Sequence, residues 1–280
     1  LENAQLDFRL GLAPFEVEVG QLYVAGDGLS LLGQGNFLAT PDGWQTAFDL
    51  QGAPMDNATV SRLMPVFLGP YEENWMTETV TWGQLSNLQV GIRQSPGVPM
   101  SVAGGFEFSD SEILPVYEAP EITHAAGLAS LVGNRLAITI DAGRVTPEQG
   151  GSLDVGGSTM VVPDMTLDRA PVAFDAQING SLTATMSLLD APAFGYTSAG
   201  GLVSDFAEGR AFTRLRIDMP MASEWEDHEL QYRADTTLRD FATTYLTPGR
   251  RIVARRVDVV ADNAALTISG PATFDGIPLT

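Results

Sequence analysis

The sequence predicts an all-β protein with a few short helices, built on a largely antiparallel sheet. Apolar and polar residues alternate with a period of two in many short segments, most of them bounded by Gly, Pro, Asn or Asp. The βαβ pattern of a parallel sheet is absent from the sequence. We therefore expect roughly twelve to sixteen strands, most of them joined as hairpins or as a meander.

Five segments show the alternation most clearly, and each is expected to be a strand with one apolar and one polar face. In the first of them, Val17 and Val19 share one face while Glu16 and Glu18 share the other. The segments are FEVEVGQLYV (15–24), RLAITID (135–141), PVAFDAQIN (171–179), SLTATMSLL (181–189) and TRLRIDMPM (213–221).

Short helices are expected to interrupt the strands near residues 56–64, 70–79 and 237–246. The second helix follows Pro70 and carries Glu72 and Glu73 in its first turn, where acidic side chains favour the helix dipole. An apolar stripe of Trp75, Met76 and Val80 completes it. We interpret this helix as a lid over an apolar sheet face, and a crossover helix packed on a closed sandwich is the alternative.

One internal repeat is visible near the two ends of the chain. GLSLLGQGNF (28–37) and ALTISGPATF (265–274) align without gaps, and an alternating segment precedes each copy. Repetition of a strand pair predicts an extended sheet built from similar units. We treat residues 1–280 as one continuous fragment, with possible sub-units 1–95 and 96–280.

The ends of the sequence predict a piece of a longer chain. Leu1 begins within an alternating pattern, without the basic and apolar regions of a signal peptide. The closing DGIPLT leaves a further strand expected. No stretch approaches 18 uninterrupted apolar residues, so no membrane-spanning helix is predicted within the sequence.

The charge balance limits the possible partners. The chain has 35 Asp and Glu against 15 basic residues, all of them Arg, for a net charge of −20. Binding of nucleic acid needs a basic stripe that neutralises phosphates, so nucleic acid is not an expected partner. The same charge disfavours prolonged contact with an anionic membrane surface. The absence of Cys excludes thiolate catalysis, disulfides and Cys-based metal sites.

The sequence contains no recognised catalytic or metal-binding motif. His124 lies in a turn-like joint, and His228 lies among carboxylates in SEWEDHEL (223–230) without the spacing of a known metal motif. Neither Ser152 nor Ser158 has the G-x-S-x-G context of a nucleophile. Nothing in the spacing of the acids selects a pair for glycoside hydrolysis. We predict no catalytic residue, no metal site and no cofactor.

The apolar face of the sheet remains the candidate site. A dry sandwich core and a groove for lipid tails produce the same alternation, so periodicity leaves both interpretations open. In the groove interpretation the lining consists of aligned apolar residues. These are Val17, Leu29, Leu31, Leu136, Ile138, Ile140, Phe174, Leu182, Met186, Leu215, Ile217, Leu266 and Ile268.

In MPVFLGPYEENWMTETVTWGQLSNLQVGI (64–92), a Pro-containing apolar segment leads into a short Trp-bearing helix and then a strand. From this segment on, most of the chain resembles the central region of the AsmA-like envelope proteins, the YhdP and TamB group of bridge-type lipid carriers. The resemblance lies in the order of strand, Gly and Pro patterns, without a catalytic signature. It continues through residues 104–145, LDVGGSTMVVPDM (153–165), residues 169–196 and LTISGPATFDGIPL (266–279).

The resemblance implies a segment of a periplasmic carrier in a Gram-negative bacterium. Members of the family are anchored in the inner membrane and extend through the periplasm as a long twisted sheet that curls into an apolar groove. They are implicated in moving phospholipids to the outer membrane and in maintaining its barrier. The implied partner is a phospholipid or another acyl-chain lipid, with membrane contact made by parts of the full-length chain absent here.

Two other classes of function stay open at this point. One is a structural or interaction scaffold of the cell envelope, whose apolar face is a sealed core. The other is a glycan-processing enzyme on a β-scaffold, which would need two carboxylates at a concave site.

Overall fold

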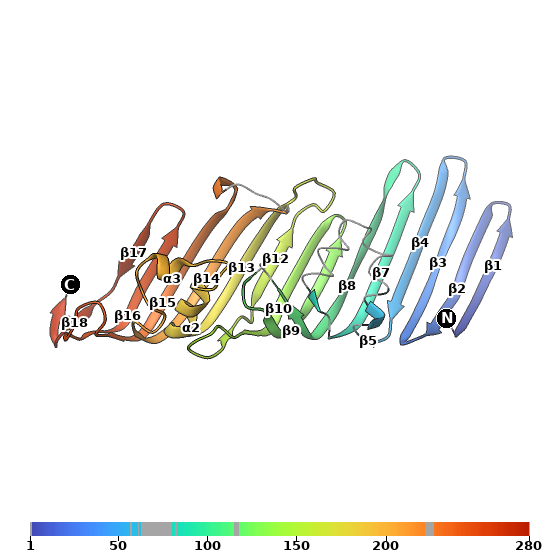
Figure 1. The fold of residues 1–280 in the computed structure, drawn as a ribbon. Coiled ribbons are helices and arrows are strands. Elements are labelled where there is room, and N and C mark those ends of the chain that lie inside the picture. The colour runs from blue at the N-terminus through green and yellow to red at the C-terminus, as the bar shows by residue number, and fades with distance from the viewer. Residues whose placement is uncertain are drawn as a thin grey trace. The chain divides into compact units, whose positions relative to one another are not determined.

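The computed structural model describes residues 2–56, 58–60, 62, 80–81, 83–114, 118–221 and 227–279 (Figure 1). The strands are β1 (Asn3–Leu12), β2 (Phe15–Gly26), β3 (Leu29–Thr40), β4 (Gly43–Gly52), β5 (Met55–Asp56), β6 (Val80–Thr81), β7 (Gln84–Ser95), β8 (Val98–Ile113), β9 (Ile122–Val132), β10 (Arg135–Val145), β11 (Leu153–Asp154), β12 (Ser158–Val162), β13 (Pro171–Ser181), β14 (Glu208–Pro220), β15 (Gln231–Thr243), β16 (Ile252–Asp262), β17 (Leu266–Ser269), β18 (Ala272–Phe274) and β19 (Ile277–Leu279). The helices are α2 (Leu182–Leu189), α3 (Tyr196–Ala199) and a 3₁₀ turn, η1 (Asp227–Glu229).

The predicted fold class is confirmed. The described strands form one 19-stranded, mostly antiparallel sheet that does not close into a barrel. A sandwich would need two sheets packed face to face, so that alternative does not describe this structure. The sheet has more strands than the expected twelve to sixteen because it includes six strands of only two to four residues. These short strands are β5, β6, β11, β17, β18 and β19.

The chain divides into two compact units. Unit 1 comprises residues 1–111, 126–138 and 163–166, and unit 2 comprises residues 112–125, 139–162 and 167–280. The structure thus groups residues 96–111 with the first unit, whereas the sequence suggested a division after residue 95.

Unit 1 is a meander of long antiparallel strands. β1 pairs with β2, β2 with β3, β3 with β4, β4 with β7 and β7 with β8. The β2–β3 hairpin turns at Asp27 and Gly28, whose φ angles of 48° and 79° are those that tight hairpin turns require. Such long pairings fix the register, and the register decides which residues share a face.

Unit 2 repeats this arrangement with strands β13 to β16. β13 pairs with β14 along its whole length, β14 with β15, and β15 with β16. The shorter strands β17 and β18 both pair with β16, and β19 pairs with β18.

The repeat found in the sequence occupies equivalent hairpins. In the first copy Val24 pairs with Leu31 and Val17 with Phe37, and the register shifts by one residue between these pairs. In the second copy Val259 pairs with Ile268 and Ile252 with Phe274, again with a one-residue shift between them. The two copies therefore share a bulged pairing as well as a residue pattern.

The strand predicted at residues 181–189 is wrong, because this segment forms helix α2. The side chain of Ser181 caps the helix by accepting a hydrogen bond of 3.0 Å from the Ala184 amide. Leu182 and Met186 are one helical turn apart, and their even spacing also fits a strand, so the sequence pattern was ambiguous. Leu182 lies in the core of unit 2 with Leu238, Phe241 and three alanines, among them Ala211. Met186 packs against that core.

The three predicted helices have different outcomes. Residues 58–60 and Arg62 are helical, within the predicted range 56–64. The range 70–79 lies outside the described residues. The helix at 237–246 is wrong, because residues 237–243 continue strand β15. Asp240 has a φ angle of 53° in a β-bulge, which turns both Leu238 and Phe241 to the buried side and imitates helical spacing.

We expect Leu182→Ala to destabilise the protein because it leaves a cavity between α2 and the sheet. The loss should be about 2–5 kcal/mol, the usual cost of such a truncation in a core. Leu189→Ala on the same helix removes a side chain that is 38% exposed and serves as the matched control. Chemical denaturation measures both variants. Equal losses would show that the α2 contact contributes no specific stability.

Candidate functional site

Unit 1 presents an apolar face formed by the in-register strands β1–β4, β7 and β8. One row of directly paired residues crosses six strands without a charged side chain. The row is Phe8, Val19, Gly35, Phe48, Ile92 and Val102. The next rows add Leu10, Val17 and Phe37 on one side and Leu22, Leu50 and Val90 on the other. Period-two alternation therefore places the apolar residues of each strand on the same face.

Large side chains on this face are open to solvent. On strand β1 the exposed fractions are 56% for Leu6, 54% for Phe8, 50% for Leu10 and 77% for Leu12. Trp44 on β4 is 49% exposed. Contiguous exposed apolar patches are rare on monomeric proteins and mark binding surfaces for other apolar groups.

Aromatic side chains on the face of unit 1 pack over glycines. A Cβ on Gly33 would lie 2.8 Å from the Phe48 ring, and a Cβ on Gly35 would clash with the backbone carbonyl of Ala47 and with Phe48. Phe37 adjoins Phe48, with ring centroids 5.9 Å apart. The glycines thus let a large ring lie close to the sheet, which fixes the local contour of the face.

The opposite face of unit 1 is polar and carries exposed ion pairs. Arg9 lies 2.9 Å from Glu18, and Arg93 lies 2.6 Å from Asp49. Exposed pairs of this kind contribute little to stability, but they keep this side of the sheet solvated. The sheet of unit 1 thus has two chemically distinct faces.

Unit 2 has an apolar face of the same kind, part of which is covered. Its rows include Phe174, Ile217 and Tyr232, then Ala176, Leu215, Ala234 and Ala261. Helix α2 packs on one end of this face through the core described above. Beyond the helix, Leu266 and Ile268 on β17 are each 65% exposed.

The structure distributes the predicted lining residues over both units. Val17, Leu29 and Leu31 lie on the apolar face of unit 1. Phe174, Leu215, Ile217, Leu266 and Ile268 lie on that of unit 2. Leu136, Ile138 and Ile140 share one side of strand β10.

The prediction is wrong for two lining residues, and most of the predicted lid helix lies outside the described residues. Leu182 and Met186 belong to helix α2, which packs on the apolar face instead of forming it, because residues 182–189 are helical. Trp75 and Met76 lie outside the described residues. Val80 begins the short strand β6 and is not helical.

Sequence analysis missed the most exposed part of the face. Leu6, Phe8, Leu10 and Leu12 alternate in NAQLDFRLGL, so period-two counting could have found them. Trp44 and Phe48 gave a weaker signal, because the polar Thr46 lies between them on the same side of strand β4.

Two polar residues of the segments named above, Glu229 and Ser158, have structural partners. Glu229 forms an ion pair of 2.6 Å with Arg169. The hydroxyl of Ser158 donates to the Val155 carbonyl at 2.7 Å and accepts from the Gln177 amide at 3.0 Å. His124 lies in strand β9 with a φ angle of 50°. Within the described ranges, no group of three or more His, Asp or Glu side chains is placed to hold a metal ion.

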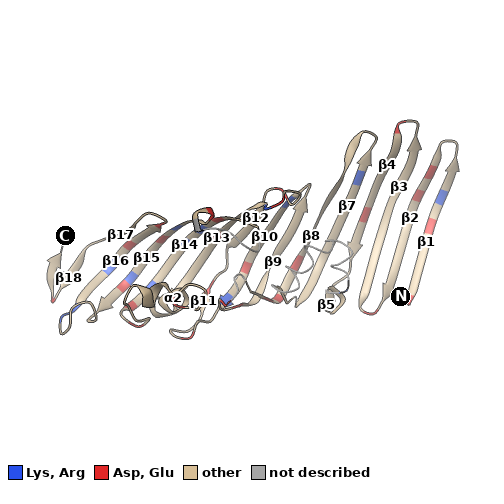
Figure 2. Cartoon of the chain, turned by 45° about the horizontal axis from the view of Figure 1, so that its top comes forward, with Lys and Arg blue, Asp and Glu red and all other residues tan. Residues whose placement is uncertain are grey.

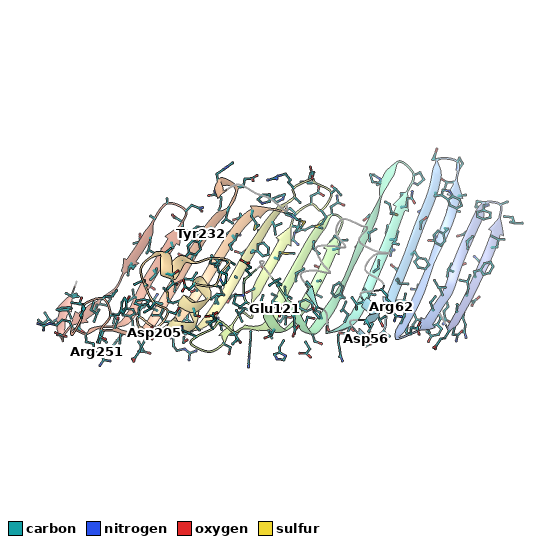
Figure 3. All side chains as sticks on the ribbon, in the orientation of Figure 1. Asp56, Arg62, Glu121, Asp205, Tyr232 and Arg251 are labelled. Atoms are coloured by element: carbon teal, nitrogen blue, oxygen red, sulfur yellow. The ribbon has the colours of Figure 1, made fainter. Side chains whose placement is uncertain are left out.

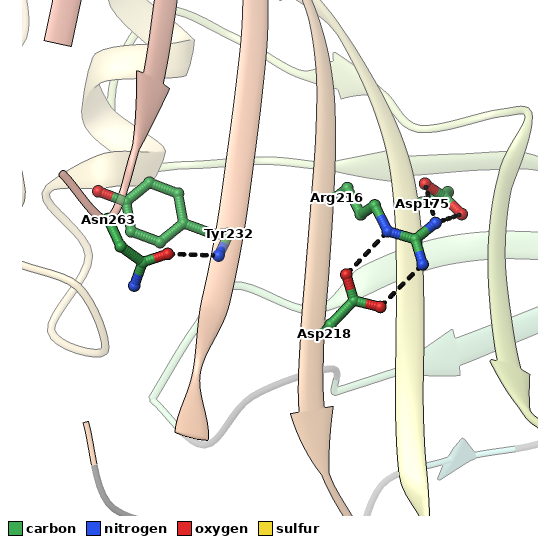
Figure 4. A network of polar contacts seen from close by, with 5 residues as sticks. All are labelled: Asp175, Arg216, Asp218, Tyr232 and Asn263. Carbon is green, nitrogen blue, oxygen red and sulfur yellow. Dashed lines mark hydrogen bonds and ion pairs between the residues drawn. The ribbon is translucent and has the colours of Figure 1, made fainter. Parts of the chain in front are cut away.

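On the polar face of unit 2, one arginine contacts two aspartates (Figure 4). Arg216 contacts Asp218 at 2.8 Å and Asp175 at 3.1 Å, and these contacts, above all the hydrogen bonds to Asp218, raise the pKa of Arg216. Near the same end of the sheet, the Asn263 side chain accepts from the Tyr232 amide at 2.8 Å and ties the β16–β17 turn to β15.

Asp262 organises this turn from its first residue. Its carboxylate accepts hydrogen bonds from the amides of Ala264 and Ala265 at 2.9 and 3.0 Å. These bonds are the main cause of a pKa below the ordinary value of 3.8.

Comparisons with known proteins identify no relative of this chain. No protein-family model, curated protein or solved structure matches it. In the part of the chain that the structure describes, none of the helices combines the length and apolarity needed to cross a membrane.

We expect Asp262→Asn to weaken the turn near neutral pH. Because the folded protein lowers the pKa of Asp262, the ionised carboxylate stabilises the fold above the ordinary value of 3.8. That contribution is lost as the pH falls through the lower folded value. The stability difference between wild type and variant should therefore shrink below about pH 4.

Thermal unfolding between pH 3 and pH 7 measures this difference. Asp205→Asn, which removes the same charge from an exposed position labelled in Figure 3, is the control. A difference that stays constant with pH would contradict the assignment.

Proposed function

We propose that this chain is a non-catalytic lipid carrier segment whose apolar sheet faces bind the acyl chains of phospholipids. The observation that supports the proposal best is the exposed apolar face of unit 1. There, in-register rows expose Leu6, Phe8, Leu10 and Leu12 to solvent by half or more. Acyl chains are the partner whose chemistry matches a surface of this composition.

The energetics of acyl binding require no specific polar contact. Burial of a CH₂ group contributes about 0.8 kcal/mol, so two acyl chains lying across several rows supply enough free energy for binding. The rows that include Phe8, Val19 and Phe48 offer apolar contact across the strands. A lipid could therefore occupy different positions on the face with similar affinity, as movement along a carrier requires.

The wider role in this proposal rests on the resemblance to AsmA-like envelope proteins. In that role the chain lies in the periplasm of a Gram-negative bacterium and holds lipids during transfer between the inner and outer membranes. The groove form of the sheet, membrane contact through other parts of the full-length chain and a part in maintaining the outer-membrane barrier belong to the same proposal.

We expect phospholipid to co-purify with the protein and to be lost when charge is placed on the apolar face. The test variant is Phe8→Glu with Leu10→Glu, which adds two carboxylates where tails would lie. The matched control is Gln5→Glu with Gln21→Glu, which adds the same charge to the polar face of the same strand pair. Native mass spectrometry after detergent-free purification, with lipid extraction in parallel, measures the bound lipid.

The proposal predicts lipid on the wild type and on the control, with little or none on the apolar-face variant. Circular dichroism spectra that match among the three proteins would exclude unfolding as the cause. A wild type without lipid, which takes up none from vesicles, would overturn the proposal. If its apolar face then proved to be covered by protein, the scaffold interpretation would replace it.

A further inference from the structure

A row of three arginines crosses the polar face of unit 2, opposite the face assigned to lipid tails. Arg210 on β14 pairs directly with Arg239 on β15, and Arg239 pairs directly with Arg256 on β16. We call these residues the arginine row. Like charges placed directly opposite each other on neighbouring strands destabilise a sheet. The chain has 35 acidic residues, so this arrangement is unexpected for a face with a purely structural role.

The arginine row is poorly neutralised by its neighbours. Arg256 binds Asp258 at 2.9 Å. Among the contacts of the described residues, Arg210 and Arg239 have no carboxylate partner, and neither has Arg214 on the same face. Asp235, which faces Arg214, pairs instead with Arg233 at 2.9 Å. Three guanidinium groups of this face, those of Arg210, Arg214 and Arg239, therefore have no ion pair among the described contacts of a protein of net charge −20.

Glu208 and Asp240, at the bulge beside the row, also form no ion pair with it among the described contacts. Some other arginines of unit 2 form ion pairs with acids, as Arg216 does with Asp175 and Asp218. Figure 2 shows the basic and acidic residues along these strands. The row thus differs from Arg216 in that two of its three members, Arg210 and Arg239, have no carboxylate partner among the described contacts.

Phe212 holds two of these guanidinium groups in place. The Arg239 guanidinium lies 5.2 Å from the centre of the Phe212 ring, and that of Arg210 lies 5.8 Å from it. Cation–π contacts of this kind orient a guanidinium without consuming its hydrogen-bond donors. The donors of both arginines therefore remain available to a ligand.

A shallow depression of about 530 Å³ lies on the same face and is bordered by two members of the row, Arg239 and Arg256, but not by Arg210. Phe212, Thr237 and Arg214 also line it, as do the carboxylates of Asp235 and Asp258. Thr237 donates to Asp258 at 2.8 Å, and Asp258 in turn binds Arg256. The depression is large enough for a phosphate group and a small substituent.

We propose that this depression is a binding site for phosphate groups. Arginine forks bind phosphate oxygens with paired, charge-assisted hydrogen bonds. Strands lie about 4.8 Å apart, so one tetrahedral anion between Arg239 and a neighbour can accept hydrogen bonds from both. A bound phosphate also relieves the repulsion within the row. The site goes beyond the proposed lipid-tail function and lies on the opposite face of unit 2.

We expect the purified protein to bind inorganic phosphate through the row. Titration with phosphate at constant ionic strength, balanced with chloride, should shift the NMR signals of a few arginine side chains to saturation. Arg210→Gln with Arg239→Gln should weaken the affinity at least about tenfold, because it removes two charged donors. The matched control is Arg144→Gln with Arg251→Gln, which removes two exposed charges elsewhere in unit 2.

The same variants also separate folding from binding. Because the test variant removes repulsion, its thermal stability without phosphate should equal or exceed that of the wild type. Phosphate should then raise the melting temperature of the wild type and of the control, but not that of the test variant.

Vesicles distinguish the two sources of phosphate. If lipid headgroups occupy the site, vesicles of 30% phosphatidylglycerol in phosphatidylcholine should bind the wild type, and free phosphate should compete with them. If the source is soluble, free phosphate binds and these vesicles do not. Either result supports the site. A phosphate response equal in wild type and test variant, or one that chloride reproduces at equal ionic strength, would overturn it.

Discussion

The register of the long antiparallel pairings is the constraint on which the structure depends. Because side chains alternate along each strand, one shared register places Phe8, Val19 and Phe48 on one face across β1, β2 and β4. The same register places Arg9 and Glu18 together on the other. A slip of one residue in β1, β2 or β4 would bring charge onto the apolar face, so hairpin turns and bulges that hold the register also define the candidate site.

A single-layer sheet has no second sheet to cover its apolar face. In a sandwich the apolar face would be covered by a second sheet, whereas the cover described here is local. In unit 2, Leu182 and Met186 of α2 cover the end of the face near Ala211 and Phe241. Elsewhere, side chains such as Leu10 and Ile268 keep half or more of their surface in contact with solvent. The two apolar faces are therefore partly open to solvent, while the packed core under α2 stabilises unit 2.

Much of this organisation could be predicted from the sequence, because alternation is a local signal. It gave the fold class and placed Val17, Leu31, Phe174 and Ile217 on apolar faces. It failed where local spacing is ambiguous. Leu182 and Met186 satisfy both periods, and the bulge at Asp240 gives Leu238 and Phe241 helical spacing within a strand. The arginine row could not be found locally, because its members are neighbours only through the strand register.

The distribution of charge on the polar face of unit 2 follows from the same register. Arg216 and Arg233 form ion pairs with aspartates on this face. Arg210 and Arg239 pair with each other across the strands instead, and Phe212 orients their guanidinium groups. An arrangement that costs stability in the free protein and presents ordered donors is typical of a binding site, since a ligand recovers the cost. The two faces of unit 2 are therefore suited to different ligands, apolar groups on one face and anions on the other.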